Sequence, residues 1–284
     1  MIQKAVILLA GYGTRCLPFT KVLPKGMIPI ITKPVIAYVV EEIEKSGMNE
    51  IIFVLPKHGN GKVIKQYFCR AKKMEKFLMQ RKNEKAMQTL QSIKTNLKTT
   101  FLFTGKANGS GGALLTAARH LKGQDFCVLN GDDLFLGTPP LLEMMKVYEK
   151  QQSSVLGTAI VENISLYGAV ETNANGQVTK LIEKPLPGQT STRQASVGRY
   201  IFTQNFLPLL KQTKAKPNGE IWLTDAIDKQ IEQDKVFACP ISAQRYDSGN
   251  PLELFKTTLA FAAQDPQMKE QIENFANKKP HSNE

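Results

Sequence analysis

The stretch Ala5-Val-Ile-Leu-Leu-Ala10-Gly-Tyr-Gly-Thr-Arg15 decides the fold class. Its first six residues form a short apolar run that stops at glycines, which is typical of a buried strand in a parallel sheet. Pro34 can open a helix at its first turn, and Ser46-Gly47 can end that helix before a second apolar run at residues 51–55. Strand, helix and strand in this order predict a βαβ unit.

Further short apolar runs extend this alternation along the first half of the chain. We expect strands at residues 99–103 and 126–129, with a helix at residues 113–120 between them. The chain is therefore predicted to be an α/β protein with a doubly wound, Rossmann-like sheet that is mixed but mostly parallel. In such sheets ligands bind at the carboxyl ends of strands, where residues 11–15 and 130–133 would lie.

The second half of the chain is rich in strands and partly antiparallel. The Asn175-Gly176 pair separates two of its apolar runs and is typical of a hairpin turn. No long linker interrupts the pattern, so we expect one domain over residues 1–265, with halves 1–150 and 151–265. Residues 266–284 are polar, and we expect a frayed tail. The expected elements are strands at 154–161, 168–171, 177–182, 196–202 and 235–241 and helices at 223–231 and 252–263.

The composition is that of a globular chain and excludes several other classes. Of the 284 residues, 42% are hydrophobic and 22% are charged, so the chain is neither disordered nor collagen-like nor a coiled coil. The apolar run at residues 5–10 is far shorter than the roughly 20 residues of a membrane span. No small-residue cleavage site follows it, so it is not a signal peptide. We expect a cytoplasmic protein without a membrane partner.

Neither the cysteines nor the histidines are spaced as metal ligands. The four cysteines stand singly, which excludes a zinc ribbon and a secreted disulfide framework, and we expect them to be reduced and mostly buried. The three histidines lack ligand or triad spacing, and His120 is expected at the end of a helix. These residues are Cys16, Cys69, Cys127, Cys239, His58, His120 and His281.

The positive charge of the chain is concentrated in residues 57–98. The segment holds twelve Lys and Arg residues against Glu75 and Glu84, so it carries ten of the twelve net charges. Its apolar residues recur at spacings of three and four, which predicts one or two amphipathic helices. A solvated helical face, with its apolar stripe in the core or in a subunit contact, is the simpler interpretation. A nucleic-acid surface is the alternative, and no nucleic-acid motif supports it.

The loop after the first strand is the first candidate site. Gly11 and Gly13 let backbone N–H groups approach a phosphate closely, and Arg15 with Lys21 and Lys25 adds cations. The loop is not a P-loop, and it lacks the third glycine of the dinucleotide fingerprint. From these residues alone, a phosphate loop and a structural turn both remain open.

Carboxylates near two predicted loops form the second candidate site. Asp132-Asp133 follows a predicted strand, and Asp247 lies in a tight loop that ends at Gly249. Carboxylate oxygens suit Mg2+, and a turn with solvated acids is the alternative. Farther along the chain, Pro185 is expected to hold Lys184 in an extended conformation.

An ordered series of short motifs covers nearly the whole chain, from residue 3 to about residue 262. In order and spacing, the series resembles the bacterial UTP:glucose-1-phosphate uridylyltransferases, which belong to the sugar nucleotidyltransferase superfamily. Such a series is far more specific than any one motif. The motifs are Leu9-Ala-Gly-Tyr-Gly-Thr-Arg15, Pro24-Lys25, Gly131-Asp132-Asp133, Tyr167-Gly168, Glu183-Lys-Pro185, Val197-Gly-Arg-Tyr200, Gly219-Glu-Ile221, Leu223-Thr-Asp-Ala226 and Arg245-Tyr-Asp247 with Gly249.

This resemblance implies transfer of a uridylyl group from UTP to glucose 1-phosphate, which yields UDP-glucose and pyrophosphate and uses Mg2+ as the cofactor. The attacking phosphate oxygen is already ionised at neutral pH, so the reaction needs alignment and charge neutralisation rather than a catalytic histidine. The resemblance also implies a homodimer or a homotetramer.

By motif match, the resemblance assigns roles to individual residues. The catalytic set is Arg15, Lys25 and Lys184, with Lys184 on the sugar phosphate. The nucleotide-binding set is Ala10, Gly11, Gly13, Thr14, Thr104, Gly109 and Asp132. The sugar-binding set is Gly168, Glu183, Gly198 and Glu220, and the metal-binding set is Asp132 and Asp247.

Several positions depart from the pattern of that family. Gly26 stands where the family has a glutamate, Thr104 where it has the glutamine that recognises uracil, and Gly112 where it has a histidine. Because the phosphate and metal residues remain, the pattern favours altered specificity over an inactive site. The other departures are Cys16 for an aromatic residue, Arg193 near an expected asparagine, and Trp222 for a glutamine.

These departures and the charge leave other functions open. The same reaction could use dTTP or another hexose 1-phosphate, or the protein could be a catalytically weak homologue that binds nucleotide and regulates a partner enzyme. A nucleic-acid-binding protein would rest on residues 57–98 alone. A metal-dependent glycosyltransferase could share the sheet and the acidic pair, but it does not explain residues 11–15 together with Lys25.

Overall fold

A computed structural model describes residues 2–57, 60–105 and 109–277, and its main feature is a mixed sheet. The parallel strands of the first half are β1 (Lys4–Leu8), β4 (Glu50–Pro56), β5 (Lys98–Thr104) and β6 (Phe126–Asn130). The strands of the second half are β8 (Ser154–Ile160), β9 (Gly168–Thr172), β10 (Val178–Glu183), β11 (Gln194–Phe202) and β12 (Val236–Pro240). Within the described residues these nine strands form one sheet, in the order β10-β9-β11-β6-β1-β4-β5, with β8 paired to β11 and β12.

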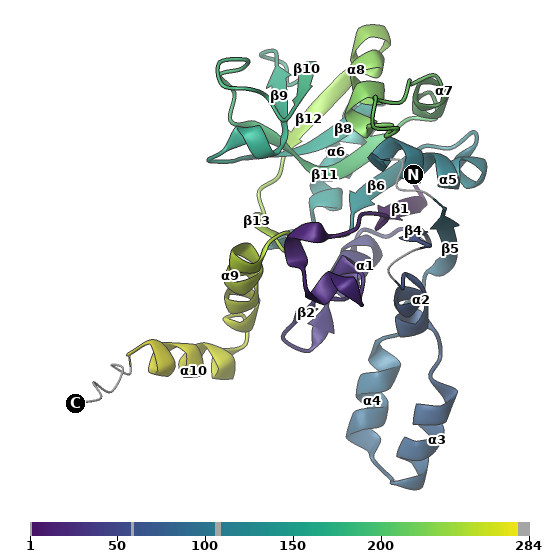
Figure 1. Cartoon of the computed structure of the whole chain (residues 1–284), viewed down its shortest axis with the longest axis vertical. Coiled ribbons are helices and arrows are strands. Elements are labelled where there is room, and N and C mark those ends of the chain that lie inside the picture. The colour runs from purple at the N-terminus through teal and green to yellow at the C-terminus, as the bar shows by residue number, and fades with distance from the viewer. Residues whose placement is uncertain (1, 58–59, 106–108, 278–284) are drawn as a thin grey trace.

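Helices cover both faces of this sheet (Figure 1). Successive side chains of a strand point to opposite faces, and here apolar side chains on both faces need to be buried. In β1, Ile7 packs with residues of α1 (Val35–Lys45) and α6 (Pro140–Gln151). Its neighbour Val6 packs on the other face, with residues of three further helices. Those helices are α5 (Gly109–Leu121), α7 (Phe206–Lys211) and α8 (Leu223–Gln233). The predicted α/β class with a mixed, mostly parallel sheet is confirmed.

The strand-rich second half joins the first half edge to edge. β11 runs antiparallel to β6 and to β8, whereas β12 runs parallel to β8. β9 and β10 form the predicted antiparallel hairpin, and Gly176 in its turn has the positive φ of 75° that this turn needs. Two short pairings were not predicted. They are β7 (Asp133–Leu136) with β13 (Gln244–Asp247), and β2 (Pro29–Ile30) with β3 (Lys33–Pro34).

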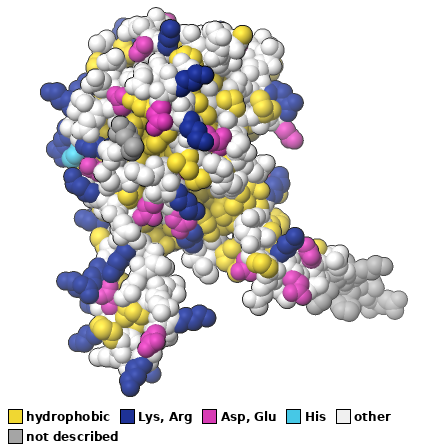
Figure 2. Space-filling model, turned by 180° about the vertical axis from the view of Figure 1, so that it is seen from behind, with side chains coloured by type: hydrophobic (Ala, Val, Ile, Leu, Met, Phe, Trp, Pro, Cys, Tyr) yellow, Lys and Arg dark blue, Asp and Glu magenta, His cyan; other side chains and the backbone are white. Residues whose placement is uncertain are grey.

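The basic segment contains more helices than predicted. It forms α2 (Lys62–Phe68), α3 (Lys72–Gln80) and α4 (Glu84–Ser92), rather than one or two helices. The breaks have local causes, because Cys69 is extended after α2, and the Asn83 side chain accepts a hydrogen bond from Ala86 N at 3.0 Å at the start of α4. α3 and α4 project from the body as a hairpin that is studded with Lys and Arg side chains (Figures 1 and 2).

The expectation of a frayed end is wrong for residues 266–277. After α9 (Pro251–Ala262), these residues form α10 (Pro266–Asn277), which extends away from the body (Figure 1). The Asp265 side chain accepts a hydrogen bond from Met268 N at 3.0 Å, and Pro266 occupies the first turn. A cap and a proline therefore start a helix in a polar sequence. Residues 278–284 lie outside the described part.

The single cysteines and histidines lie mostly as predicted. All four cysteines are free; Cys16, Cys127 and Cys239 are buried, but Cys69 is exposed. His120 lies in the last turn of α5, while His58 and His281 lie outside the described residues. Among the helices in the described ranges, none combines the length and the apolar character that a bilayer crossing requires.

Candidate active site

Two adjoining cavities open at the carboxyl ends of β1 and β6, where the sequence places its candidate residues. The first has a volume of about 440 Å3 and is lined mainly by residues from the first half of the chain. The second, of about 920 Å3, lies toward the second half. Arg15, Asn130 and Asp132 line both cavities. A ligand that extends from one cavity into the other must therefore pass these three side chains.

The loop after β1 forms one wall of the first cavity. Ala10, Gly11, Gly13, Thr14 and Arg15 all line it, as the sequence predicts. Gly13 has a φ of 64°, which favours glycine, and its carbonyl accepts a hydrogen bond from the Thr20 hydroxyl at 2.8 Å. A Cβ built on Gly11 would meet nothing within 4 Å, so its backbone faces open space.

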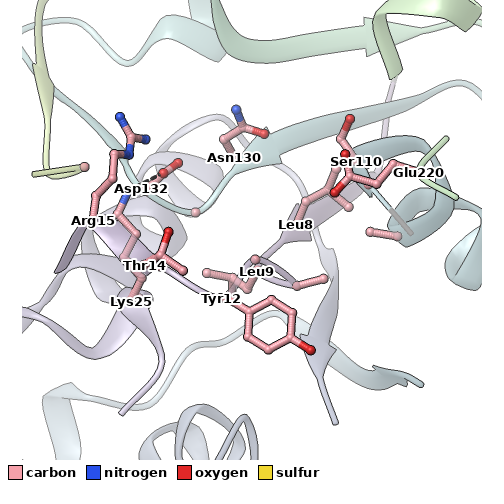
Figure 3. A pocket seen from close by; sticks show the side chains of 18 residues that line it. Leu8, Leu9, Tyr12, Thr14, Arg15, Lys25, Ser110, Asn130, Asp132 and Glu220 are labelled. Atoms are coloured by element: carbon pink, nitrogen blue, oxygen red, sulfur yellow. Dashed lines mark hydrogen bonds and ion pairs between the residues drawn. The ribbon is translucent and has the colours of Figure 1, made fainter. Parts of the chain in front are cut away.

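The polar side chains of the first cavity separate into two groups (Figure 3). Arg15, Lys25 and Asp132 gather at one end, while Ser110 and Glu220 lie at the other end. A triphosphate needs the cations, whereas a carboxylate such as Glu220 suits hydroxyl or amide N–H donors of a ligand. The cavity can therefore hold a ligand with an anionic end and a neutral polar end.

Lys25 and Asp132 form the charged contact at the anionic end. The ammonium group of Lys25 donates to Asp132 Oδ2 at 2.5 Å (Figure 3). Burial raises the pKa of Asp132, but Lys25, Arg245 and Arg15 outweigh burial and leave that pKa below its usual value. Asp132 is thus held as a carboxylate beside two cationic side chains of the cavity wall.

The unpredicted pairing of β7 with β13 brings Asp247 to the same place. Asp247 lies opposite Asp133 in the register of the two strands. The Arg245 guanidinium donates to Asp133 Oδ1 through Nε at 2.8 Å and also through Nη2, so Asp133 is engaged in an ion pair. Asp132 and Asp247 both line the second cavity. Two carboxylates from distant parts of the chain therefore face one space.

These two carboxylates fit a magnesium ion that is shared with a substrate. In the described part of the chain, no group of three or more His, Cys, Asp or Glu residues is arranged to hold a metal. Mg2+ keeps several waters and is usually bound through one or two carboxylates plus substrate phosphates. Asp132 and Asp247 could supply such a donor set, and the cations Arg15 and Lys25 lie beside Asp132.

The second cavity contains three of the four predicted sugar-binding residues. Gly168, Glu183 and Gly198 line it. Burial raises the pKa of Glu183, although Lys184 acts against the shift. A Cβ on Gly168 would lie 3.4 Å from Glu183 Oε2, and a Cβ on Gly198 would lie 2.4 Å from Asn130 Nδ2. The glycines therefore leave room for the polar groups of this wall.

Glu220 lies in the first cavity rather than with the other predicted sugar-binding residues. Its carboxylate Oε2 accepts a hydrogen bond from Trp222 Nε1 at 2.9 Å and one from Asn218 Nδ2 at 3.2 Å. Gly109 lies close by, because a Cβ there would be 3.1 Å from Glu220 Cβ. Trp222, one of the departures from the family pattern, thus orients a carboxylate at the cavity wall.

Two predicted site residues line neither cavity. Thr104 is buried at the end of β5, and its carbonyl accepts a hydrogen bond from Lys57 N at 3.1 Å. Lys184 is exposed after β10 and has a φ of 48°, so the expected extended conformation is wrong. The cause is tertiary, because Lys184 N donates to Tyr167 O at 2.9 Å and curls the chain before Pro185.

The departure at Gly26 also has a structural counterpart. A Cβ on Gly26 would lie 2.9 Å from Leu9 Cδ2, and a Cβ on Gly131 would lie 2.2 Å from the same atom. Leu9 therefore occupies the space beside both glycines at the wall of the first cavity. With Leu9 in this position, neither glycine can be replaced by a residue with a side chain unless Leu9 moves.

Two buried side chains beside the site were given no role from the sequence. Arg199 has no exposed surface and contacts the turn after β6, and Ser248 is equally buried and contacts Asp132. For Arg199 the sequence did contain a signal, which is a single arginine within the otherwise mostly apolar strand at residues 196–202. A buried arginine almost always has a partner, so this pattern indicates an ion pair or a similar contact. For Ser248 the sequence offered no signal beyond its position after Asp247.

Comparison with known proteins agrees with this geometry. A sequence model described as nucleotidyl transferase matches residues 4–264. The chain belongs to the nucleotidyl transferase family. This nucleotidyl transferase is 35% identical over 282 residues to the UTP–glucose-1-phosphate uridylyltransferase of Staphylococcus epidermidis, a match that covers 96% of this chain and 97% of the relative.

Solved structures of this nucleotidyl transferase family have the same fold. A UTP-bound UGPase from Acinetobacter baumannii matches with a TM-score of 0.88 at 29% identity, covering 99% of this chain and 100% of that chain. A UDP-glucose pyrophosphorylase complexed with UDP-glucose matches with a TM-score of 0.81 at 29% identity, covering 93% and 100%. The resemblance to the bacterial uridylyltransferases that the motifs indicated is thus confirmed.

Proposed function

We propose that the protein transfers a uridylyl group from UTP to glucose 1-phosphate and so forms UDP-glucose and pyrophosphate. The observation that carries this proposal is the pair of adjoining cavities that share Arg15, Asn130 and Asp132. A nucleoside triphosphate in the first cavity and a sugar phosphate in the second would meet at these residues. The relatives named above, which include structures with UTP and with UDP-glucose, support the choice of substrates.

In this reaction a phosphate oxygen of glucose 1-phosphate attacks the α-phosphorus of UTP. The bond between the α-phosphorus and the bridging oxygen to the β-phosphorus breaks, and pyrophosphate leaves with that oxygen. The nucleophile is already ionised, so no side chain has to remove a proton. The chain must therefore align two anions and neutralise their charge.

The residues of the first cavity suit this task. Backbone N–H groups around Gly11 and Gly13 would approach the triphosphate, with Ala10 and Thr14 beside them. Arg15 and Lys25 would neutralise the phosphates. Magnesium, when bound, neutralises phosphate charge and orients the oxygens, and Asp132 with Asp247 would hold it.

The glucose and the nucleoside would contact parts of the two cavities that are lined by glycines and glutamates. Gly168, Glu183 and Gly198 would contact the glucose hydroxyls in the second cavity. We place Glu220 with the nucleoside because it lines the first cavity at the end away from the cations (Figure 3). Gly109 belongs with it, since a Cβ there would lie 3.1 Å from Glu220 Cβ. Lys184 is exposed and lines neither cavity, so its side chain would have to move before it could reach the sugar phosphate. Its φ of 48° is a conformation that residues other than glycine rarely adopt.

A second candidate is the same reaction with another nucleotide or hexose 1-phosphate. The observation that favours it is that Thr104 lines neither cavity, although the family has its uracil-recognising glutamine at that position. A catalytically weak regulator receives less support, because Arg15, Lys25, Asp132 and Asp247 are all present at the cavity walls.

The first experiment measures pyrophosphate release with Mg2+ and glucose 1-phosphate, offering UTP, dTTP, ATP, GTP and CTP in turn. We expect release chiefly with UTP, and its loss in Asp132→Ala. Equal rates with several nucleotides would contradict strict UTP use. Absence of release with every nucleotide, from folded protein, would contradict this choice of substrates; bound UDP-glucose without turnover would then support the regulator.

We also propose a cytoplasmic homo-oligomer, a homodimer or a homotetramer, in which residues 1–265 act as one domain. Cytoplasm is where UTP and sugar phosphates are made. Both apolar clusters of the core draw on each half of the chain, which supports the single domain. Exposed Leu252 and Phe255 on α9 and Phe275 on α10 offer apolar surface for a subunit contact. Sedimentation equilibrium would test the oligomer.

A further inference from the structure

The turn between β6 and β7 carries Asp132, and its backbone is held from behind by Arg199. The guanidinium of Arg199 donates through Nη1 to Asn130 O at 3.1 Å and through Nη2 to Asp133 O at 2.8 Å. These two carbonyls flank Gly131 and Asp132. The remaining donors of Arg199 bind the Glu42 carboxylate, with Nε at 3.0 Å from Oε1 and Nη2 at 2.8 Å from Oε2.

The sequence places Arg199 there through an irregularity in β11. The pairing of β11 with β8 shifts register between Ser196 and Tyr200, and such a bulge redirects side chains. Gly198 within it has a φ of 65°, a conformation that favours glycine. Gly157 on β8 provides space, because a Cβ there would lie 3.0 Å from Arg199 Cβ. A strand of the sugar-binding half therefore supplies a cation to the turn of the nucleotide-binding half.

Ser248 holds the middle carbonyl of the same turn. Its hydroxyl donates to Asp132 O at 2.8 Å, and its backbone N–H points to the same oxygen at 3.3 Å. The Cys16 thiol lies 3.5 Å from Gly249 O and 3.8 Å from Ser248 O, so the loop after β1 contacts the same backbone. Together, Arg199 and Ser248 engage the carbonyls of Asn130, Asp132 and Asp133.

We propose that Arg199 and Ser248 are positioning residues that fix the backbone of this turn, so that the Asp132 carboxylate faces the bound metal and phosphates. The inference rests on the proposed function insofar as Asp132 is a metal ligand. The Asp132 side chain moves whenever the backbone of its turn moves. Mutation of residues that hydrogen-bond to metal ligands commonly lowers metal affinity about 10- to 100-fold. The competing explanation is that Arg199 serves only to neutralise buried Glu42.

The first test compares two buried serines. Ser248→Ala removes the hydroxyl bond to Asp132 O, while Ser46→Ala removes a bond of the same type, from Ser46 Oγ to Glu42 O at 2.7 Å on α1. The probe is Mn2+, titrated by electron paramagnetic resonance in the presence of UTP without sugar phosphate. We expect the Mn2+ dissociation constant to rise about tenfold in Ser248→Ala and to stay within twofold in Ser46→Ala, with similar thermal midpoints.

The second test separates Arg199 from its ion pair. Arg199→Lys keeps a buried cation but lacks the fork that reaches Glu42 and both carbonyls at once. Glu42→Gln disturbs the ion pair and leaves the two carbonyl contacts possible. We expect Glu42→Gln to lower the thermal midpoint with little change in Mn2+ affinity, and Arg199→Lys to weaken Mn2+ binding about tenfold or more at a comparable midpoint.

The outcomes distinguish this inference from the proposed function. If Asp132→Ala weakens Mn2+ binding but Ser248→Ala and Arg199→Lys do not, the positioning role is wrong and the metal role of Asp132 stands. If the affinity follows the thermal midpoint across all four variants, Arg199 is structural only. Normal Mn2+ binding in Asp132→Ala would overturn the assignment of the metal ligand itself.

Discussion

The turn at residues 130–133 and the hairpin of α3 and α4 both carry charged side chains, and they use charge in opposite ways. In the turn, Asp132 and Asp133 are surrounded by Lys25, Arg199 and Arg245. On the hairpin, the Lys and Arg side chains point into solvent (Figure 2). Charge that is desolvated and paired changes pKa values and orients groups, whereas solvated charge is screened.

This contrast changes the interpretation of the net charge. The basic segment supplies ten of the twelve net charges, yet its hairpin lines neither of the two cavities at the strand ends. The turn contributes only two charges and takes part in both cavities. The location of a charge relative to the sheet therefore says more about function than the number of charges.

The largest expected effect is that of Lys25→Ala. Loss of the ammonium group removes the partner of Asp132 and a cation for the phosphates, so we expect turnover to fall about a thousandfold. Steady-state pyrophosphate release measures it. Lys21→Ala, an exposed lysine in the same loop that lines neither cavity, is the matched control and should retain turnover within a factor of about two. Equal losses in both variants would contradict a specific role for Lys25.

Asp247→Asn should have the next largest effect on activity. In the unsubstituted protein Gly249 N donates to Asp247 Oδ1 at 2.6 Å. The asparagine amide keeps the shape of the side chain and an oxygen that can accept this bond, but it removes one negative charge from the proposed metal site. We expect turnover to fall about a hundredfold and the half-saturating Mg2+ concentration to rise. A Mg2+ titration at saturating UTP measures both. A loss of turnover with unchanged Mg2+ dependence would contradict a metal role.

Arg245→Met tests how much the buried ion pair with Asp133 contributes to the free energy of unfolding. It leaves Asp133 as a buried carboxylate without its ion-pair partner, so we expect the free energy of unfolding to fall by about 3–5 kcal/mol. Urea denaturation measures the change. Lys98→Met breaks the pair that exposed Lys98 forms with buried Glu50, whose Nζ–Oε2 distance is 3.6 Å. It should cost less than about 1 kcal/mol, because this lysine is solvated and Lys4 remains 3.8 Å from the same oxygen. Similar losses would mean that the burial of the cation does not decide how much an ion pair contributes to the stability of this protein.

The smallest effect is expected on the hairpin. The triple variant Lys73→Gln, Lys76→Gln and Lys82→Gln removes three positive charges from exposed positions of α3 and the turn after it. We expect turnover within a factor of about two and a change in unfolding free energy within about 0.5 kcal/mol. The same two assays measure both. A loss of turnover above tenfold would contradict this expectation and show that the charge on the hairpin affects catalysis in the cavities.

The meeting of Arg15 with Asp132 could be predicted, because it follows from topology. Both residues come just after parallel strands, and the carboxyl ends of adjacent parallel strands lie at one edge of a sheet. β1 and β6 are such neighbours. The strands themselves, although not their order in the sheet, followed from short apolar runs separated by helical segments. Periodicity therefore predicted the part of the site that depends on the regular framework.

The contacts of Arg199 and Ser248 could not be predicted, because they depend on irregular structure. Arg199 reaches the turn through a register shift in β11, and alternation within a strand gives no warning of such a shift. Ser248 contacts Asp132 across 116 positions of sequence. The placement of Glu220 in the first cavity likewise depends on the loop that Trp222 fixes. Local patterns do not encode long-range contacts between loops.

The packing of Leu9 between two glycines has an evolutionary consequence. Because one methyl group of Leu9 occupies the space beside both Gly26 and Gly131, substitutions at these positions are not independent. A relative that carries glutamate at the position of Gly26 should hold its side chain at the position of Leu9 in another rotamer or have a smaller side chain there. Side chains at positions 26 and 131 should therefore be tolerated best in variants whose residue at position 9 leaves this space free.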